Sequence, residues 1–196
     1  WCFHFGSEFA SGWPGTDLIE TMVAREGGLE LYDAWTLHEV AFDHPVVMTA
    51  AEKVERLLLT DGFARGGSER ISGLDFFNEG LNPLLQEEPE CWLLHQGDFL
   101  MGTAPADAVV GRDIDAFPVP PLEAGQPTPA LGGGNLLSVL GDRPEVRAFV
   151  MAAASPAWGE EWASQQAGNF ISPNARFDVD TYASAVDEEE RSFRRT

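Results

Sequence analysis

The stretch of sequence that decides the fold most clearly is DHPVVMTAAEKVERLLLTDG, residues 43–62. Pro45 suits the first turn of a helix, because its missing N–H would have had no partner there. The apolar residues that follow recur at the 3.6-residue period of a helix with one buried face. They are Val46, Val47, Ala50, Ala51, Val54, Leu57 and Leu58. The pattern predicts an amphipathic helix that begins near Pro45 and ends at Asp61-Gly62.

On both sides of this helix, helical patterns alternate with short apolar runs that are typical of buried strands. The runs that predict strands lie at residues 1–5, 91–94, 115–119 and 136–140. Helices are expected from the N-cap Thr16 to Gly27-Gly28, around Trp35, and from Asp142-Arg143-Pro144-Glu145 onward. The proline-rich residues 118–129 are expected to form a connector. The alternation predicts an α/β layered fold.

The chain is strongly acidic, with 32 Asp and Glu against 12 Lys and Arg in 196 residues, a formal net charge of −20. A surface that negative repels phosphate backbones and anionic lipid headgroups, so neither nucleic acid nor bare membrane is an expected partner. The charge also serves solubility and identifies no function by itself. No apolar run approaches the roughly 20 residues of a membrane span. The chain has no recognisable signal peptide and reads as a mature or truncated piece.

The spacing of the reactive residues does not support metal or nucleophile chemistry. The histidines are scattered, and no His-x-x-x-His, Cys-x-x-Cys or Gly-x-Ser-x-Gly motif occurs. Two carboxylates could serve glycoside hydrolysis, but 32 acidic residues offer so many pairs that a pair means little. We therefore expect no metal and no cofactor. Cys2 and Cys91 lie in apolar runs, where they are either two buried thiols or a disulfide of an exported protein.

Trp13 is the most informative single residue, because glycine and proline flank it in the loop from Ser11 to Asp17. Its ring is either a plug over the core or a platform for a ligand. A sugar packs its C–H groups on an aromatic face, while its hydroxyls need carboxylates and amides at the rim. The side chains that could supply such groups are those of Glu8, Asp17, His95, Gln96 and Asn135. An aromatic ring together with these carboxylate, amide and imidazole groups has the chemistry of a carbohydrate-binding site.

The glycine run Gly132-Gly133-Gly134 differs from a phosphate-binding loop. A phosphate cradle leads into a helix N-terminus and usually precedes a lysine, whereas an apolar run without lysine follows here. The glycines therefore serve either as a tight turn or as a place where the backbone approaches a ligand.

Four segments of the chain, with a weaker fifth at residues 170–174, carry a resemblance to one known family. The four are Trp1-Cys2 with Ser11–Asp17, then Glu90–Gln96, Leu131–Asn135 and Asp142–Ala148. In these segments the sequence resembles the extracellular solute-binding proteins of carbohydrate ABC importers, the family that includes maltose-binding protein. It is most similar to the alpha-glucoside-type sugar binders. The matches follow the expected order along nearly the whole chain.

The resemblance implies a fold and a domain arrangement. The family has two α/β lobes that hold a sugar between them and close by a hinge. The chain corresponds to the C-terminal portion, a lobe of the type II periplasmic-binding-protein kind, with the first lobe largely missing. We expect residues 1–128 and 167–196 to form this lobe, and residues 129–166 to be the segment that returns to the N-terminal lobe. The face of Trp158 and Trp162 is then exposed or covered by a second copy.

The resemblance also implies roles for the candidate site residues. By position, Trp13 is the stacking platform for the sugar. His95 and Gln96 follow a strand that delivers ligand contacts in this family. The opposite wall of the cleft is implied to consist of Gly133, Gly134 and Asn135. Asn135 stands where the family would have Asp, which removes a charged hydrogen bond. The resemblance further implies a Cys2–Cys91 disulfide.

The resulting hypothesis is a substrate-binding component of an ABC-type sugar importer, and not an enzyme. It would capture an extracellular mono- or oligosaccharide, such as a glucoside, in an inter-lobe cleft and deliver it to the membrane permease. Its expected partners are the sugar and the permease subunits, in the periplasm or at the extracellular face of the cell membrane. Contact with the membrane is expected only through the permease or through a lipid anchor in the N-terminal part that the chain lacks.

Two other functions remain open on the sequence. One is a carbohydrate-active enzyme of the glycoside hydrolase kind, which would use paired carboxylates and would turn over a glycoside. The other is an interaction domain in which Trp13 is a structural residue and no sugar binds.

Overall fold

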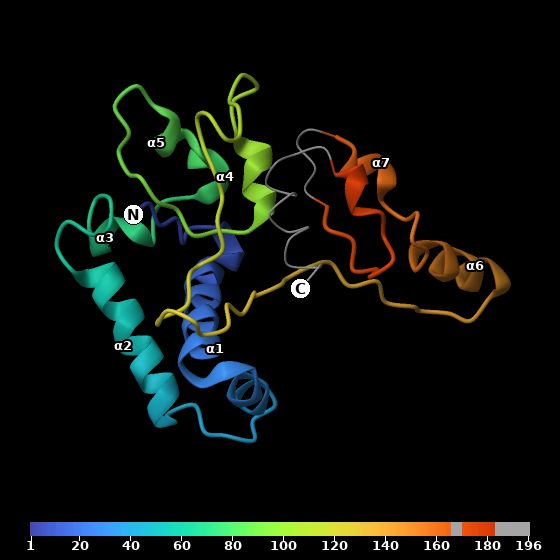
Figure 1. The fold of residues 1–196 in the computed structure, drawn as a ribbon, viewed down its shortest axis with the longest axis horizontal. Coiled ribbons are helices and arrows are strands. Elements are labelled where there is room, and N and C mark those ends of the chain that lie inside the picture. The colour runs from blue at the N-terminus through green and yellow to red at the C-terminus, as the bar shows by residue number, and fades with distance from the viewer. Residues whose placement is uncertain (166–169, 183–196) are drawn as a thin grey trace. The chain divides into compact units, whose positions relative to one another are not determined.

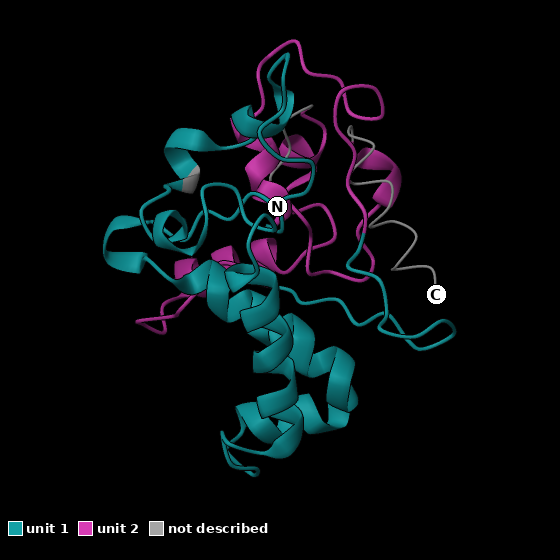
Figure 2. Cartoon of the chain, turned by 90° about the vertical axis from the view of Figure 1, so that its left-hand side faces the viewer, with its two compact units in different colours: residues 1–96, 118–132 teal, residues 97–117, 133–196 magenta. Residues whose placement is uncertain are grey.

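The structure is a computed structural model that describes residues 1–165 and 170–182. Its contacts divide the chain into two units, residues 1–96 with 118–132 (unit 1) and residues 97–117 with 133–196 (unit 2), shown in Figure 2. The chain therefore leaves unit 1 after Gln96, returns at Pro118 and leaves again after Gly132. None of the helices in the described ranges is long and apolar enough to span a membrane.

Unit 1 is built on two helices that pack side by side, α1 and α2 (Figure 1). Its elements are η1 (Glu8–Ala10), α1 (Trp13–Thr36), α2 (Pro45–Leu59), α3 (Ser68–Ile71), α4 (Phe76–Glu79) and α5 (Asn82–Leu85). Helix α2 confirms the amphipathic pattern, since Val47, Ala50 and Val54 are buried in it. At its start, the backbone N–H of Val46 donates to Nδ1 of His44 at 3.3 Å and so caps the helix.

Helix α1 differs from the prediction at its start and confirms it at its break. It begins at Trp13, three residues before the expected N-cap Thr16, so Trp13 is helical and does not lie in a loop. The reason is that Gly12 takes a left-handed conformation, with φ 100°, and Pro14 then fits the first helical turn. Gly28, with φ 76° and ψ 174°, breaks the helix where the sequence predicted an end. The short helix predicted around Trp35 is the remainder of α1.

The predicted strands do not form in the described part of the chain. Only isolated bridges are present there, between Cys2 and Leu94, between Gly6 and Asp75, and between Val110 and Ile114. Residues 1–5 are largely buried, as their apolar character predicted, but they meet residues 91–94 only at the Cys2–Leu94 bridge, so no ladder develops. Residues 115–119 form no bridge to any described residue. Residues 136–140 are exposed and form no bridge to any described residue. The α/β layering of the fold-class prediction is therefore not confirmed, and the regular structure of the described residues is almost entirely helical.

The Cys2–Cys91 disulfide is confirmed. The two cysteines are bonded, with their Cα atoms 5.7 Å apart, and both are buried. Beside the bond, the N–H of Cys2 donates to the carbonyl of Leu93 at 2.8 Å. The disulfide thus joins the N-terminal segment to residues 91–94, and the alternative of two buried thiols is excluded.

Unit 2 contains η2 (Asp98–Thr103), α6 (Pro144–Ala153), α7 (Glu160–Ala163) and η3 (Val179–Thr181). Helix α6 begins at Pro144, as predicted. Aromatic rings follow one another at centroid distances of 5.2–6.2 Å along a series that ends on the buried Phe177 and Tyr182. The series is Phe149, Trp158, Trp162, Phe170, Phe177 and Tyr182. Trp162 remains 53% exposed in it.

The expected division into a lobe of residues 1–128 and 167–196 and a returning segment of residues 129–166 stays a prediction. Of these residues, 166–169 and 183–196 lie outside the described ranges.

Candidate functional site

The clearest candidate site is a cavity of about 330 Å³ between η1 and α4 in unit 1. We call it the η1–α4 cavity. Its lining consists of Ser7, Glu8, Phe9, Ala10, Asp75, Phe77 and Asn78. The two segments meet because Gly6 bridges to Asp75, with the Gly6 N–H donating to the carbonyl of Leu74 at 2.8 Å. One backbone contact therefore brings together residues that are far apart in the sequence.

Hydrogen bonds shape both walls of the η1–α4 cavity. On the η1 side, the hydroxyl of Ser11 donates to the carbonyl of Glu8 at 2.7 Å and accepts from the N–H of Ser7 at 2.9 Å. On the α4 side, Oδ1 of Asp75 accepts from the N–H groups of Phe77 and Asn78, at 2.8 and 3.2 Å. Asp75 thus acts as the N-terminal cap of α4.

Glu8 stands out among the lining residues because its backbone is strained. Its φ is 46°, in the left-handed region that a residue with a Cβ adopts at a cost of roughly 1–2 kcal/mol. Its side chain is exposed, and among the described residues none donates a hydrogen bond to its carboxylate. Strain of this kind is found preferentially where a side chain is held for binding or catalysis.

The chemistry of the lining suits an uncharged ligand rich in hydroxyl groups. The side chains of Phe9 and Phe77 are 99% and 70% exposed, which leaves apolar ring surface for C–H groups. Glu8 and Asn78 offer acceptors, and Asn78 also a donor, for hydroxyls. The lining includes no Lys or Arg that would neutralise an anionic ligand. Apart from Glu8, none of these residues was predicted. The cavity arises from the contact of Gly6 with Leu74 and Asp75, which a pattern within one short segment cannot indicate.

The predicted residues Trp13 and Asp17 lie one turn apart at the start of α1 and hence on the same side of the helix. Both are partly buried. Burial raises the pKa of Asp17, and the neighbouring charge of Glu20 raises it further. Glu20 in turn accepts a hydrogen bond of 2.6 Å from the hydroxyl of Tyr32, whose pKa is raised to about 12, first by burial and then by this bond.

His95 and Gln96 lie at the end of the first stretch of unit 1, and both are partly buried. Burial lowers the pKa of His95, and the positive charge of Arg25 lowers it further. The imidazole is therefore neutral at physiological pH. A neutral imidazole offers one donor and one acceptor, which suits a hydroxyl group.

Gly133, Gly134 and Asn135 belong to unit 2 and lie in an exposed stretch without turns. The alternative of a tight turn at these glycines is therefore wrong. A Cβ added at Gly133 or Gly134 would meet no atom within 4 Å, so the packing of the described residues does not demand glycine at either position. The structure thus groups Glu8, Trp13, Asp17, His95 and Gln96 in unit 1 and the other three predicted residues in unit 2.

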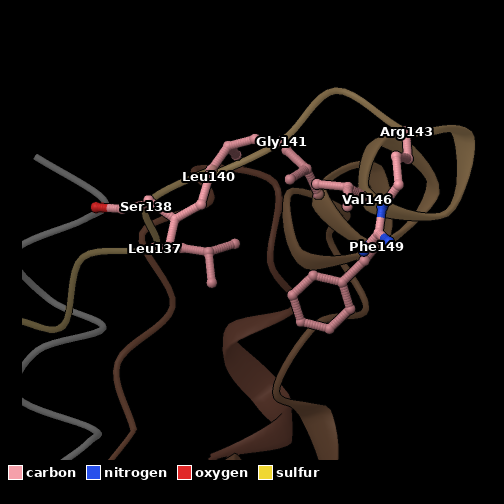
Figure 3. A pocket seen from close by; sticks show the side chains of 9 residues that line it. Leu137, Ser138, Leu140, Gly141, Arg143, Val146 and Phe149 are labelled. Carbon is pink, nitrogen blue, oxygen red and sulfur yellow. The ribbon is translucent and has the colours of Figure 1, made fainter.

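A second cavity, of about 470 Å³, lies in unit 2 between residues 137–141 and helix α6 (Figure 3). Its lining is mostly apolar, including Leu137, Val146 and Phe149, with Ser138 and Arg143 as the polar members. This cavity lacks the set of carboxylates and amides that a sugar requires. As for metals, no three His, Cys, Asp or Glu side chains within the described ranges are placed to hold an ion.

His4 lies buried beside the disulfide segment, and neither of its ring nitrogens has a hydrogen-bond partner among the described residues. Burial lowers the pKa of His4. The negative charges of Glu79, whose Oε2 is 3.9 Å from Nε2 of His4, and of Asp75 raise the pKa of His4. The positive charge of Arg65 lowers this pKa, as burial does. Because Arg65 already pairs with Glu79 and Glu90, the carboxylate of Glu79 compensates only in part.

We expect His4 to make the protein less stable as the pH falls below about 6.5, the ordinary pKa of histidine. Below that pH, His4 binds a proton in the unfolded state but stays neutral in the folded state, where its pKa is lowered. Acid therefore favours unfolding. The melting temperature, measured from pH 8 to pH 5, should fall less steeply in His4→Gln than in the wild type. The exposed His38, changed to Gln, is the control and should leave the slope unchanged. An equal slope in the wild type and His4→Gln would contradict this account.

Comparison with known proteins identifies the class to which the chain is related. No family model and no solved structure matches it. Two curated relatives match it along nearly its whole length, and both are binding proteins. The resemblance to extracellular solute-binding proteins, drawn above from sequence motifs, is therefore confirmed.

The first relative is the alpha-glucosides-binding periplasmic protein AglE of Rhizobium meliloti (strain 1021). It is 34% identical over 186 residues, which are 94% of this chain and 40% of that protein. The second is the osmoprotective compounds-binding protein GgtB of Synechocystis sp. (strain ATCC 27184 / PCC 6803 / Kazusa), 31% identical over 183 residues, or 93% of this chain and 42% of that protein. The chain thus spans about two fifths of the length of these relatives.

Proposed function

We propose that the protein is the substrate-binding component of an ABC-type sugar importer and has no catalytic activity. The observation that carries this proposal is the similarity over 94% of the chain to an alpha-glucosides-binding periplasmic protein. The ligand is a mono- or oligosaccharide, with a neutral glucoside as the first candidate. Two lobes hold it in a cleft, and the present chain contributes the greater part of one lobe.

The geometry of unit 1 supports this class of ligand. The η1–α4 cavity combines exposed phenyl rings with carboxylate and amide groups, the two kinds of surface that sugars need. In this proposal Trp13 stacks on a sugar ring, and Glu8, Asp17, His95 and Gln96 bind hydroxyl groups. The backbone of Gly133 and Gly134 and the side chain of Asn135 are further proposed contacts of the ligand. The cavity lining includes no Lys or Arg, which favours a neutral sugar over an anionic one.

The proposed location is the periplasm or the extracellular face of the cell membrane, where the loaded protein delivers its sugar to the permease subunits. The Cys2–Cys91 disulfide supports this location, because such bonds persist in oxidising compartments. Contact with the membrane is through the permease or a lipid anchor.

The test is a calorimetric titration of the protein with a panel of neutral glucosides, together with an assay for released glucose. We expect a complete two-lobed cleft to bind with a dissociation constant in the micromolar range, about −8 kcal/mol, and this chain alone with one in the millimolar range, about −4 kcal/mol. No released glucose is expected. Trp13→Ala should abolish binding while its circular dichroism stays that of the wild type. If no glucoside binds, the proposal fails. If glucose is released, the protein is a glycoside hydrolase.

Glu8 allows a sharper test, because its substitution by glycine separates binding from folding. Glu8→Gly removes the carboxylate and relieves the strain at φ 46°, so stability should stay within about 1 kcal/mol of the wild type or rise. Affinity should fall at least tenfold, by about 1.4 kcal/mol. His38→Gly is the matched control, since His38 is also exposed at a positive φ, 62°, and lies outside the cavity. Equal affinity in Glu8→Gly and His38→Gly would remove Glu8 from the site.

A further inference from the structure

Arg25 binds three backbone carbonyl groups at once. From its place on α1 it donates through Nη1 to the carbonyl of Thr21 at 3.1 Å and through Nε to that of Pro120 at 3.1 Å, and through Nη2 to that of Val119. Two of these acceptors are consecutive residues of the connector, and the third lies one turn back on α1. A planar guanidinium with fixed N–H directions is suited to such a contact, which a lysine would not reproduce.

The sequence of the connector explains why a side chain supplies these hydrogen bonds. Pro118, Pro120 and Pro121 lack a backbone N–H, so this stretch has few donors with which to pair against another backbone. Its carbonyl groups nevertheless need partners where they are covered by protein. Arg25 is partly buried and satisfies two of them. The contact is therefore an attachment of the connector to α1.

The attachment lies just after the point where the chain returns to unit 1 at Pro118. Where the chain departs, a few residues before Gly97, the disulfide of Cys91 and the bridge of Leu94 to Cys2 hold it to the N-terminal segment. Residues 97–117, which belong to unit 2, are thus preceded and followed by residues of unit 1 that are held in place. One anchor is covalent, and the other is the Arg25 guanidinium.

We propose that Arg25 is a positioning residue of the binding site, which fixes the connector on α1 within unit 1, the unit that holds His95 and Gln96. The role of His95 toward a ligand rests on the function proposed above. The positive charge of Arg25 acts on the imidazole of His95 and lowers its pKa. One guanidinium therefore both attaches the connector and adds to the effect of burial, which is the main cause of the lowered pKa of His95.

The experiment compares Arg25→Met and Arg25→Lys with Arg147→Met in the full protein. Methionine removes the donors and the charge, and lysine keeps the charge but loses the planar fork. Arg147 is the control, because it is exposed and pairs only with the exposed Asp142 in the described part of the chain. Three quantities are measured: deuterium uptake by peptides covering residues 118–132, the pKa of His95 by NMR, and the affinity for the glucoside that binds best to the wild type.

In Arg25→Met we expect faster deuterium uptake in the connector, a higher pKa of His95 and an affinity about tenfold weaker. Arg25→Lys should speed deuterium uptake but leave the pKa of His95 nearer to its wild-type value. Arg147→Met should change none of the three quantities. If Arg25→Met does not fold, Arg25→Lys carries the comparison of uptake and affinity.

Unchanged uptake and an unchanged pKa of His95 in a folded Arg25→Met protein would overturn the proposal. So would faster uptake with wild-type affinity, because the attachment would then have no bearing on the site. If the wild type binds no glucoside, the proposed function fails, while uptake and the His95 titration still show whether Arg25 attaches the connector.

Discussion

Replacing both Cys2 and Cys91 with alanine is expected to lower the free energy of unfolding by about 4–5 kcal/mol. The bond joins residues 89 positions apart, and in the chain-entropy model a link of that span restricts the unfolded chain by this amount. A domain of this size is stable by only about 5–15 kcal/mol, so the loss removes a large share of its stability. Without the bond, the N-terminal segment meets residues 91–94 through a single backbone bridge.

The measurement is urea unfolding of the double variant and of the wild type, with and without a reducing agent. The reduced wild type is the control, because it keeps both sulfur atoms in the core and loses only the bond. It should unfold at nearly the same urea concentration as the double variant. A difference of less than 1 kcal/mol between the oxidised and reduced wild type would show that the bond contributes little.

Gly6→Ala is expected to destabilise the protein by about 1–3 kcal/mol and to abolish sugar binding. A Cβ at this position would lie 2.9 Å from the carbonyl oxygen of Leu74 and 3.3 Å from that of Ser72. These are backbone atoms, which cannot turn aside as a flexible side chain would. Because Leu74 precedes Asp75, any relaxation moves one wall of the η1–α4 cavity away from the other.

Gly133→Ala is the matched comparison for Gly6→Ala, since a Cβ at Gly133 meets no atom within 4 Å. Its stability should stay within about 0.5 kcal/mol of the wild type. If the backbone of Gly133 approaches the ligand as proposed, the affinity of this variant falls although its stability does not. Melting temperatures and glucoside titrations of both variants provide the test. A Gly6→Ala protein as stable as the wild type would contradict the close contact with Leu74.

Helices were predicted well because their signals are local. Pro45 and the apolar stripe behind it mark α2, and Pro144 marks the start of α6, in agreement with the structure. The strands were predicted poorly, because a run of apolar residues indicates that a segment is buried but does not indicate which segment it pairs with. Residues 1–5 are largely buried as expected, yet a strand also needs a partner along its length, and Cys2 meets Leu94 at one position only.

The candidate site shows the same division. Glu8 was predicted from the kind of group that binds a sugar, and it lines the η1–α4 cavity. Phe9 and Phe77 were missed, because an exposed phenylalanine cannot be told from a core residue in the sequence. Asn78 was missed because the cavity forms through a contact between segments that are far apart in the chain. The role of Trp13 in the site stays a prediction, and its place in a loop was wrong. The left-handed conformation of Gly12, which starts α1 earlier, has no clear sequence signal.

By itself, the sequence determined the main helices, the acidic charge, the resemblance to solute-binding proteins and, through that resemblance, the disulfide. These follow from periodicity over a few turns, from composition, and from motifs in a fixed order. The tertiary structure alone decided the η1–α4 cavity, the burial of His4 without a hydrogen-bond partner among the described residues, and the attachment of the connector by Arg25. Each of these depends on contacts between residues far apart in the chain. Such contacts depend on how the backbone closes on itself, which no local pattern of residues records.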